Sequence, residues 1–249
     1  MHRSPLPEKY RYLSAFSLRM CAMALMLCDH LWASIIPGNG WMTMLGRLAF
    51  PIFAFQIAEG YVHTSDYGRY VKRLFLFALL SEIPFNLFYI SSPFFPFHQN
   101  VLFTLLLGLL SLRQIDRIKN AETFRNRIRP VLMLLFLLLL SVILFPDYGI
   151  RGVLTVVAFY LFRNASFYWL WQIAAMVLLN IVGFEGLQIP VTLFDISFEI
   201  PQQGFAVLSL LLIWCYSGKK GYRVKAAQYG FYAFYPLHML LLYLIRLLP

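Results

Sequence analysis

Charged residues are scarce in this chain of 249 residues: only 13% of them are Asp, Glu, Lys or Arg. A soluble domain usually carries about 25% charged residues, so a water-soluble enzyme of this size would have too little polar surface to cover itself. Cysteine is rare as well. The three cysteines lie in apolar segments and form no C-x-x-C pair, so we expect neither a disulfide framework nor a structural zinc site.

Several motifs of common enzymes are missing from the sequence. There is no P-loop, no G-x-G-x-x-G, no H-E-x-x-H and no G-x-S-x-G. Their absence argues against the usual ATPase, dehydrogenase, zinc protease and serine hydrolase classes. The His, Asp and Arg residues of the apolar segments form no closed set of metal ligands, and we therefore predict no metal site.

Apolar residues are what the chain has in excess, at 60% of its composition and with a mean hydropathy of +0.68. A transmembrane helix needs about 20 apolar residues, and the alternation typical of a membrane β-barrel is missing. We predict an all-α, polytopic bundle that forms a single domain over 1–249. The nine predicted spans are 13–36, 41–61, 71–90, 101–112, 130–146, 149–162, 166–183, 204–217 and 228–248.

Basic residues predict the orientation of this bundle. With a cytoplasmic N-terminus and nine crossings, 17 of the 21 Lys and Arg residues lie inside, while the outer segments 91–99 and 184–202 have none. This is the positive-inside pattern, and it predicts a C-terminus outside a bacterial cytoplasmic membrane. The net charge of +10 is therefore explained by topology and not by nucleic-acid binding. The basic face is also suited to anionic lipids or an anionic cofactor.

Arg19 and His30 are ionisable residues inside the first predicted span. They are eleven residues apart, which on an α-helix is three turns plus about 20° and a rise of about 16 Å. Both side chains therefore share one face, with Arg19 nearer the cytoplasm. An imidazole with a pKa near working pH is a natural general base. A phosphate-bearing donor with a thin arm, such as acetyl-CoA, fits the separation between the two groups.

Asp29 and Arg47 have two alternative roles. Asp29 points about 100° away from His30 on an ideal helix, so it either contacts the acceptor or pairs with another span. Arg47, in the second span, supplies either a binding or oxyanion-stabilising charge or a partner for Asp29 that holds the first two spans together. Pro51 is expected to kink that second span.

Three further polar residues lie in or beside apolar segments. Glu82 and Asn100 are predicted near the outer face, where they either line an acceptor pocket or cap helices. His238 is predicted near mid-bilayer, two residues after Pro236. It either lines a site or is satisfied by a carbonyl that the proline frees.

Short motifs along most of the chain resemble the TraX family, the pilin N-acetylation proteins of conjugative systems and their bacterial relatives. The ten residues between Arg19 and His30 also look like the Arg-x10-His pattern of membrane acyltransferases. The motifs are Arg19 through Asp29-His30, Gly46-Arg47 through Ala49-Phe50-Pro51, Tyr70, Arg73-Leu74, Asn100-Val101-Leu102-Phe103, Tyr148-Gly149-Ile150 with Gly152, and Phe234-Tyr235-Pro236-Leu237-His238.

The resemblance implies acetyl transfer from acetyl-CoA to an amine or hydroxyl acceptor of the cell envelope. It implies His30 as the catalytic base with Asp29 beside it, Arg19 facing the CoA phosphates, and Arg47 and His238 completing the site. Lys72 and Arg73 add cytoplasmic basic charge for CoA, and Glu82 and Asn100 are the candidate acceptor contacts. The alternatives are a proton-coupled transporter or flippase, for which no internal repeat is seen, and a non-catalytic envelope or pilus assembly protein.

Overall fold

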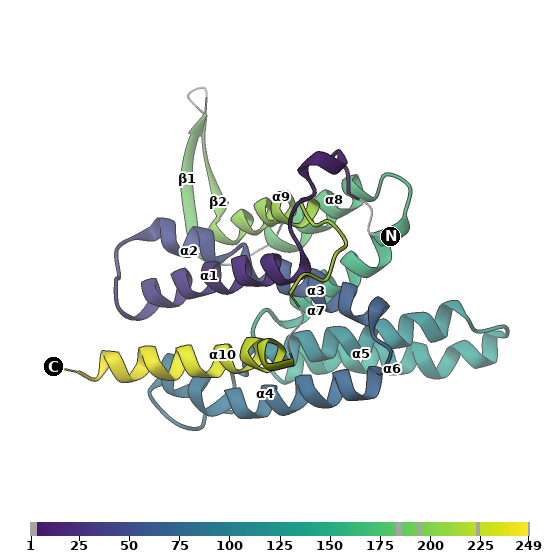
Figure 1. The fold of residues 1–249 in the computed structure, drawn as a ribbon, viewed down its shortest axis with the longest axis horizontal. Helices are drawn as coiled ribbons and strands as arrows, with labels where there is room; N and C mark the ends of the chain where they lie inside the picture. The colour runs from purple at the N-terminus through teal and green to yellow at the C-terminus, as the bar shows by residue number, and fades with distance from the viewer. Residues whose placement is uncertain (1–3, 183–185, 194–195, 223–224, 249) are drawn as a thin grey trace. The chain divides into compact units, whose positions relative to one another are not determined.

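The computed structural model describes residues 4–182, 186–193, 196–222 and 225–248 (Figure 1). Two of the predicted cytoplasmic basic residues, Arg3 and Arg223, lie outside these ranges. The helices in chain order are η1 (Glu8–Tyr10), α1 (Ala15–Ser34), α2 (Gly40–Gly46), α3 (Ala49–His63), α4 (Tyr67–Ile90), α5 (Val101–Lys119), α6 (Phe124–Ile143), α7 (Gly149–Leu161), η2 (Phe162–Asn164), α8 (Tyr168–Asn180), η3 (Gln202–Leu208), α9 (Ser209–Trp214) and α10 (Lys225–Arg246).

The helical fold class is confirmed, and each of the nine predicted apolar segments contains a helix. Within the described ranges, three stretches are long and apolar enough to cross a membrane: Gly40–His63, Tyr67–Ile90 and Phe124–Ile143. Crossing by the other segments, and the orientation of the two termini, stay predictions.

One β-hairpin was not predicted. It joins β1 (Gln188–Leu193) to β2 (Ile196–Pro201) in antiparallel register, from the pair Gln188↔Pro201 to the pair Leu193↔Ile196. The hairpin lies in the segment 184–202, which the sequence analysis treated only as an outer loop. A search for membrane-spanning runs overlooks strands of six residues, because these are too short to cross a bilayer.

The second predicted span, 41–61, is divided between α2 and α3 at Arg47 and Leu48. The predicted kink at Pro51 is therefore misplaced. Pro51 lies in the first turn of α3, where a backbone N–H would have no helical partner in any case. The interruption comes earlier, where the chain turns so that Arg47 contacts α1.

The chain divides into two compact units, each made of separate stretches of sequence. The first unit contains residues 1–53 and 161–223. In it α1 packs on α2, and η3 packs on α2, α8 and α9. A parallel bridge joins Leu13 to Tyr216, in which the Leu13 amide donates to the Cys215 carbonyl (3.0 Å) and the Ser217 amide donates to the Leu13 carbonyl (2.8 Å).

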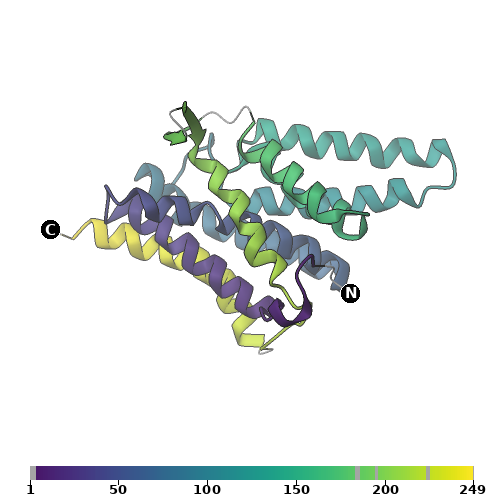
Figure 2. The ribbon, with the colours of Figure 1, turned by 90° about the horizontal axis from the view of Figure 1, so that it is seen from above.

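The second unit contains residues 54–160 and 224–249. Its helix α4 packs on α5 and α10, and α5 packs on α6. Figures 1 and 2 both show α5 and α6 side by side as an antiparallel hairpin. Leu107, Leu137 and Val153 form a buried cluster between α5, α6 and α7. Gly108 lets α5 and α7 approach closely, since a Cβ there would lie 2.8 Å from Val156 Cγ2.

Candidate functional site

Arg19 and His30 both lie in α1, which is an uninterrupted α-helix, as the predicted shared face requires. The helix begins after Ser14, whose hydroxyl accepts from the Ser17 amide at 3.1 Å. His30 is 6% exposed and lies on the buried stripe of α1 with Leu18, Ala22 and Met26. Arg19 is half-buried. The structure thus buries the imidazole in the first unit, and ideal helix geometry puts the half-buried Arg19, three turns earlier, about 20° from it around the helix axis.

Asp29 pairs with Arg47, which confirms the alternative in which the two residues hold the first two predicted spans together. Arg47 Nη2 lies 2.7 Å from Asp29 Oδ1 and 2.6 Å from Asp29 Oδ2. The same nitrogen donates to the Thr43 hydroxyl at 3.1 Å. Both charged side chains are largely covered, with 25% exposure for Arg47 and 15% for Asp29. The pair therefore fixes the end of α2 against the turn of α1 that carries His30.

Gly46 explains how α2 approaches α1 so closely. A Cβ at this position would lie 2.3 Å from Asp29 Cβ and 2.7 Å from Asp29 Cγ. Real Cβ atoms do not come this near to another carbon, so any side chain here would displace Asp29 or move the helix. The two residues of the Gly46-Arg47 motif therefore act together. Gly46 permits the close approach of α2 to α1, and Arg47 binds Asp29.

Lys72 and Arg73, the predicted CoA contacts in α4, differ in their surroundings. Lys72 is exposed. The Arg73 guanidinium lies over the ring of Tyr70, 5.6 Å from its centroid, and over that of Tyr232, at 5.3 Å. Arg73 Nε is buried and has no hydrogen-bond partner among the described residues. The contact of both residues with CoA stays a prediction.

Glu82 and Asn100, the predicted acceptor contacts, are in direct contact. Asn100 Nδ2 donates to Glu82 Oε2 and to the Ala78 carbonyl at 2.8 Å. Its Oδ1 accepts from the Leu102 amide at 3.0 Å, which caps α5. Glu82 Oε1 and both amide atoms of Asn86 are buried without a hydrogen-bond partner in the described part of the chain. The structure therefore shows Asn100 as the cap of α5, and contact of Glu82 and Asn100 with an acceptor stays a prediction.

His98 and Asp147 form an ion pair that the sequence analysis missed. His98 Nε2 lies 3.8 Å from Asp147 Oδ1, and Phe85 packs edge-on against the imidazole at 4.9 Å. The Asp147 carboxylate raises the pKa of His98 above its ordinary value of 6.5, Glu82 adds to this effect, and partial burial opposes it. No sequence signal could have joined these residues, because they lie in two loops separated by α5 and α6.

This pair predicts a pH-dependent stability. A folded-state pKa raised above the unfolded value means that the contribution of His98 is fully present below about pH 6.5 and is lost as pH rises through the folded-state pKa. We expect the thermal midpoint of the wild-type protein to exceed that of His98→Gln at pH 5.5 and the difference to shrink toward pH 8. Scanning calorimetry across this range checks it, and a difference that grows with pH would contradict it.

His238 is 6% exposed in α10. Its Nδ1 lies 2.7 Å from the Phe234 carbonyl, and its ring stacks on Phe234 at 4.6 Å. Because a carbonyl only accepts, Nδ1 carries the proton, and Nε2 of the neutral ring is left as the basic nitrogen. The carbonyl used is that of the preceding turn. Pro236 frees a different carbonyl, that of Tyr232. The predicted contact of His238 with a carbonyl freed by the proline is therefore not the one seen.

Asp116 holds a second polar cluster that the sequence did not reveal. It accepts from the hydroxyl of Tyr61 at 2.6 Å and from that of Tyr160. These residues come from α3, α5 and α7, so the carboxylate joins three helices of the second unit. The sequence did not reveal this cluster because hydrogen bonds between distant helices leave no periodic signal.

The predicted site residues are distributed over both units. Four of the predicted site residues contact one another in two pairs, Asp29 with Arg47, as one alternative predicted, and Glu82 with Asn100, which was not predicted as a pair. Across the described ranges, no group of three His, Cys, Asp or Glu side chains is arranged to hold a metal ion, and the predicted lack of a metal site stays a prediction. The first unit contains Arg19, Asp29, His30 and Arg47, and the second contains Lys72, Arg73, Glu82, Asn100 and His238.

Long apolar helices with a few paired, buried ionisable groups define a helical membrane protein. The chain belongs to the TraX protein family, whose model matches residues 14–246 and so runs through both units. It is similar to the probable fimbrial assembly protein FimC, serogroup H1, of Dichelobacter nodosus. The two are 31% identical over 244 residues, which cover 92% of this chain and 94% of the relative. No solved structure matches the chain.

Proposed function

We propose that this protein is a membrane-embedded acetyltransferase that serves the assembly of pili or fimbriae. It transfers acetyl from cytosolic acetyl-CoA to an amine or hydroxyl of an envelope component at the outer face. Membership of the TraX family and the likeness to a probable fimbrial assembly protein support a pilus-related role. In this proposal the chain crosses the bacterial cytoplasmic membrane nine times, with its N-terminus inside and its C-terminus outside.

The observation that carries the proposal is the burial of His30 in α1, on a helix whose geometry brings Arg19, three turns earlier, to within about 20° of it around the helix axis. An ionisable group in a membrane-embedded segment is costly, at about 2.5–3.5 kcal/mol for a charged residue on insertion scales. A face-matched guanidinium adds to that cost. The pairing of Asp29 with Arg47 leaves Asp29 engaged with its neighbouring helix and His30 as the base of this stretch.

The reaction needs one proton transfer and one acyl transfer. The His30 imidazole takes the proton from the acceptor amine or hydroxyl while the acceptor N or O attacks the thioester carbonyl. The new C–N or C–O bond forms as the C–S bond breaks. The CoA thiolate leaves with the electron pair and receives the proton from the imidazolium, which returns His30 to its neutral form.

The other residues have supporting roles in this proposal. Arg19 binds the phosphates of CoA from the helix that also carries His30. Asp29 and Arg47 are positioning residues, because their ion pair holds α1 where His30 must act. Glu82 and Asn100 contact the acceptor.

Binding of acetyl-CoA tests the proposal directly. We expect acetyl-CoA to raise the thermal midpoint of the purified wild-type protein, since a ligand that binds only the folded state stabilises it. Arg19→Gln removes a charge-assisted contact of about 1.5–3 kcal/mol, so the dissociation constant should rise about tenfold or more.

Arg246→Gln is the matched control, because this arginine contacts Ser91 at 2.9 Å and is predicted on the outer side. It should leave the affinity for acetyl-CoA unchanged. A wild-type protein that acetyl-CoA fails to stabilise would contradict the proposal. That outcome would favour the proton-coupled transporter or the non-catalytic assembly protein.

A further inference from the structure

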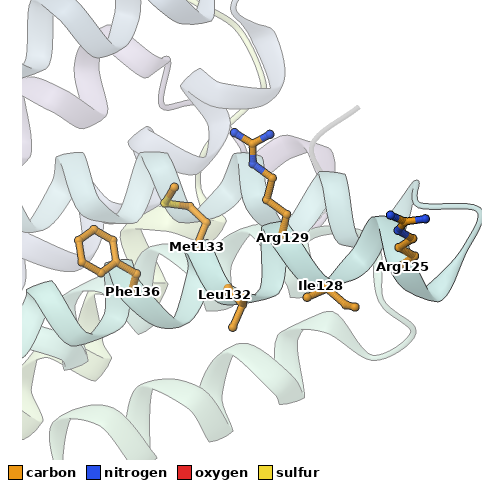
Figure 3. A pocket seen from close by; sticks show the side chains of 6 residues that line it. All are labelled: Arg125, Ile128, Arg129, Leu132, Met133 and Phe136. Atoms are coloured by element: carbon orange, nitrogen blue, oxygen red, sulfur yellow. The ribbon is translucent and has the colours of Figure 1, made fainter.

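Helix α6 carries a surface groove of about 520 Å³ on one of its faces (Figure 3). All the side chains that line it come from this helix, at the spacing i, i+3, i+4, i+7, i+8 and i+11, so they form one continuous stripe. The stripe begins with two arginines and continues with apolar residues. Its members are Arg125, Ile128, Arg129, Leu132, Met133 and Phe136.

The charged end of the stripe has an unfavourable position on its own helix. The N-cap of α6 is Thr123, and the first turn contains no acidic residue. Arg125 therefore lies in the first turn, where the helix macrodipole is positive and favours an anion, and Arg129 adds a second positive charge one turn later. Both are exposed, and no ion pair found among the described residues includes either of them. An external phosphate would offset both the side-chain charge and the dipole.

The apolar end of the stripe is open as well. Leu132 is 61% and Phe136 51% exposed. Phe124–Ile143 is one of the stretches that are long and apolar enough to cross a membrane, and only 17% of its apolar window is buried within the protein. From Arg129 to Phe136 the helix rises about 10 Å. A ligand on this face therefore meets two cations first and then a hydrocarbon surface along the helix axis.

We propose that this stripe is a binding site for an anionic phospholipid of the cytoplasmic leaflet. The phosphate of the lipid lies between the guanidinium groups of Arg125 and Arg129. One acyl chain lies along Ile128, Leu132, Met133 and Phe136. The orientation follows from the basic segment 113–129, which the positive-inside pattern places on the cytoplasmic side.

The chemistry of the groove favours this occupant over two others. A free phosphate would use the arginines and leave the apolar half uncovered. A second copy of the chain related by a two-fold axis would bring the same exposed arginines toward one another, which costs Coulomb energy. An anionic phospholipid satisfies both halves at once, since one molecule has a phosphate and a long hydrocarbon chain.

Native mass spectrometry of the detergent-solubilised full chain with added dioleoyl phosphatidylglycerol tests the site. Loss of one arginine near a phosphate costs about 1 kcal/mol, so Arg129→Gln should weaken lipid binding about fivefold. The matched control is Arg127→Gln, on the same turn with the same loss of charge. Its guanidinium is directed to the Ala121 carbonyl at 3.3 Å and not to the stripe, so this variant should keep the wild-type affinity.

Comparisons with phosphatidylcholine, with inorganic phosphate and of the oligomeric state distinguish the phospholipid from the other two candidates. Phosphatidylglycerol should bind more tightly than phosphatidylcholine and should raise the thermal midpoint, whereas inorganic phosphate should not. Equal effects of the two lipids, or equal stabilisation by inorganic phosphate, would overturn the proposal. So would equal losses in Arg127→Gln and Arg129→Gln, or a lipid-independent change of oligomeric state in Arg129→Gln. Retention of the thermal midpoint without lipid shows that a variant is folded.

Discussion

Replacing His30 by glutamine is expected to reduce acetyl transfer by about 10²–10⁴-fold, the usual contribution of a general base. Glutamine keeps a polar side chain of similar size at a position that is 6% exposed, but it cannot take up a proton at neutral pH. The measurement is transfer of labelled acetyl from acetyl-CoA to envelope components in membranes that contain the protein. Binding of acetyl-CoA should be unchanged, because the expected loss is in the chemical step and not in donor affinity.

His63→Gln is the control for this experiment. His63 lies at the end of α3, where its Nε2 is 3.4 Å from Glu59 Oε2 and its side chain is 46% exposed. This variant should transfer acetyl at the wild-type rate. If His30→Gln kept full activity in a folded protein, His30 would not be the base, and His238 would be the next candidate because its Nε2 is the basic nitrogen of the ring.

Replacing Gly46 by alanine is expected to produce the largest loss of stability. The added methyl group would lie 2.3 Å from Asp29 Cβ, so either the helices separate or the Asp29–Arg47 pair breaks. Overpacking of this kind costs about 1–3 kcal/mol, and removal of one partner from a buried ion pair costs about 3–5 kcal/mol. In a chain of this length each kcal/mol lowers the thermal midpoint by about 2–4 °C.

Gly40→Ala provides a control in the same helix. A Cβ at Gly40 would have no heavy atom within 4 Å, and alanine favours helix more than glycine does. This variant should therefore match or exceed the thermal midpoint of the wild-type protein, while Gly46→Ala falls below it. Equal midpoints for the two variants would show that the close approach of α2 to α1 contributes nothing to stability.

The sequence predicted the helices because long apolar runs have few other stable forms in a membrane. It could not predict where a run is divided. The division of 41–61 at Arg47 and Leu48 depends on a contact with Asp29, eighteen residues away in the chain, and the visible signal, Pro51, pointed to a later residue. The β1–β2 hairpin was missed because its strands are short and lie outside every apolar run.

The placement of two candidate groups on one helix was predictable. The spacing of Arg19 and His30 is a property of α-helical geometry, and α1 is uninterrupted. Pairing across helices was harder to predict. The sequence left two alternatives for Asp29, contact with the acceptor or pairing with another span, and only the tertiary structure shows that it pairs with Arg47. The pair of His98 with Asp147, and that of Asp116 with Tyr61, had no counterpart in any pattern of the sequence.

The bridge between Leu13 and Tyr216 has a consequence for biosynthesis. Its two strands are separated by roughly two hundred residues, so the first unit cannot close until the ribosome has made almost the whole protein. At about 5–20 residues per second this takes about 10–40 s. During that interval the segment before α1 lacks its partner at residues 215–217, and a nascent chain cut short before residue 216 would leave this segment unpaired and open to proteolysis.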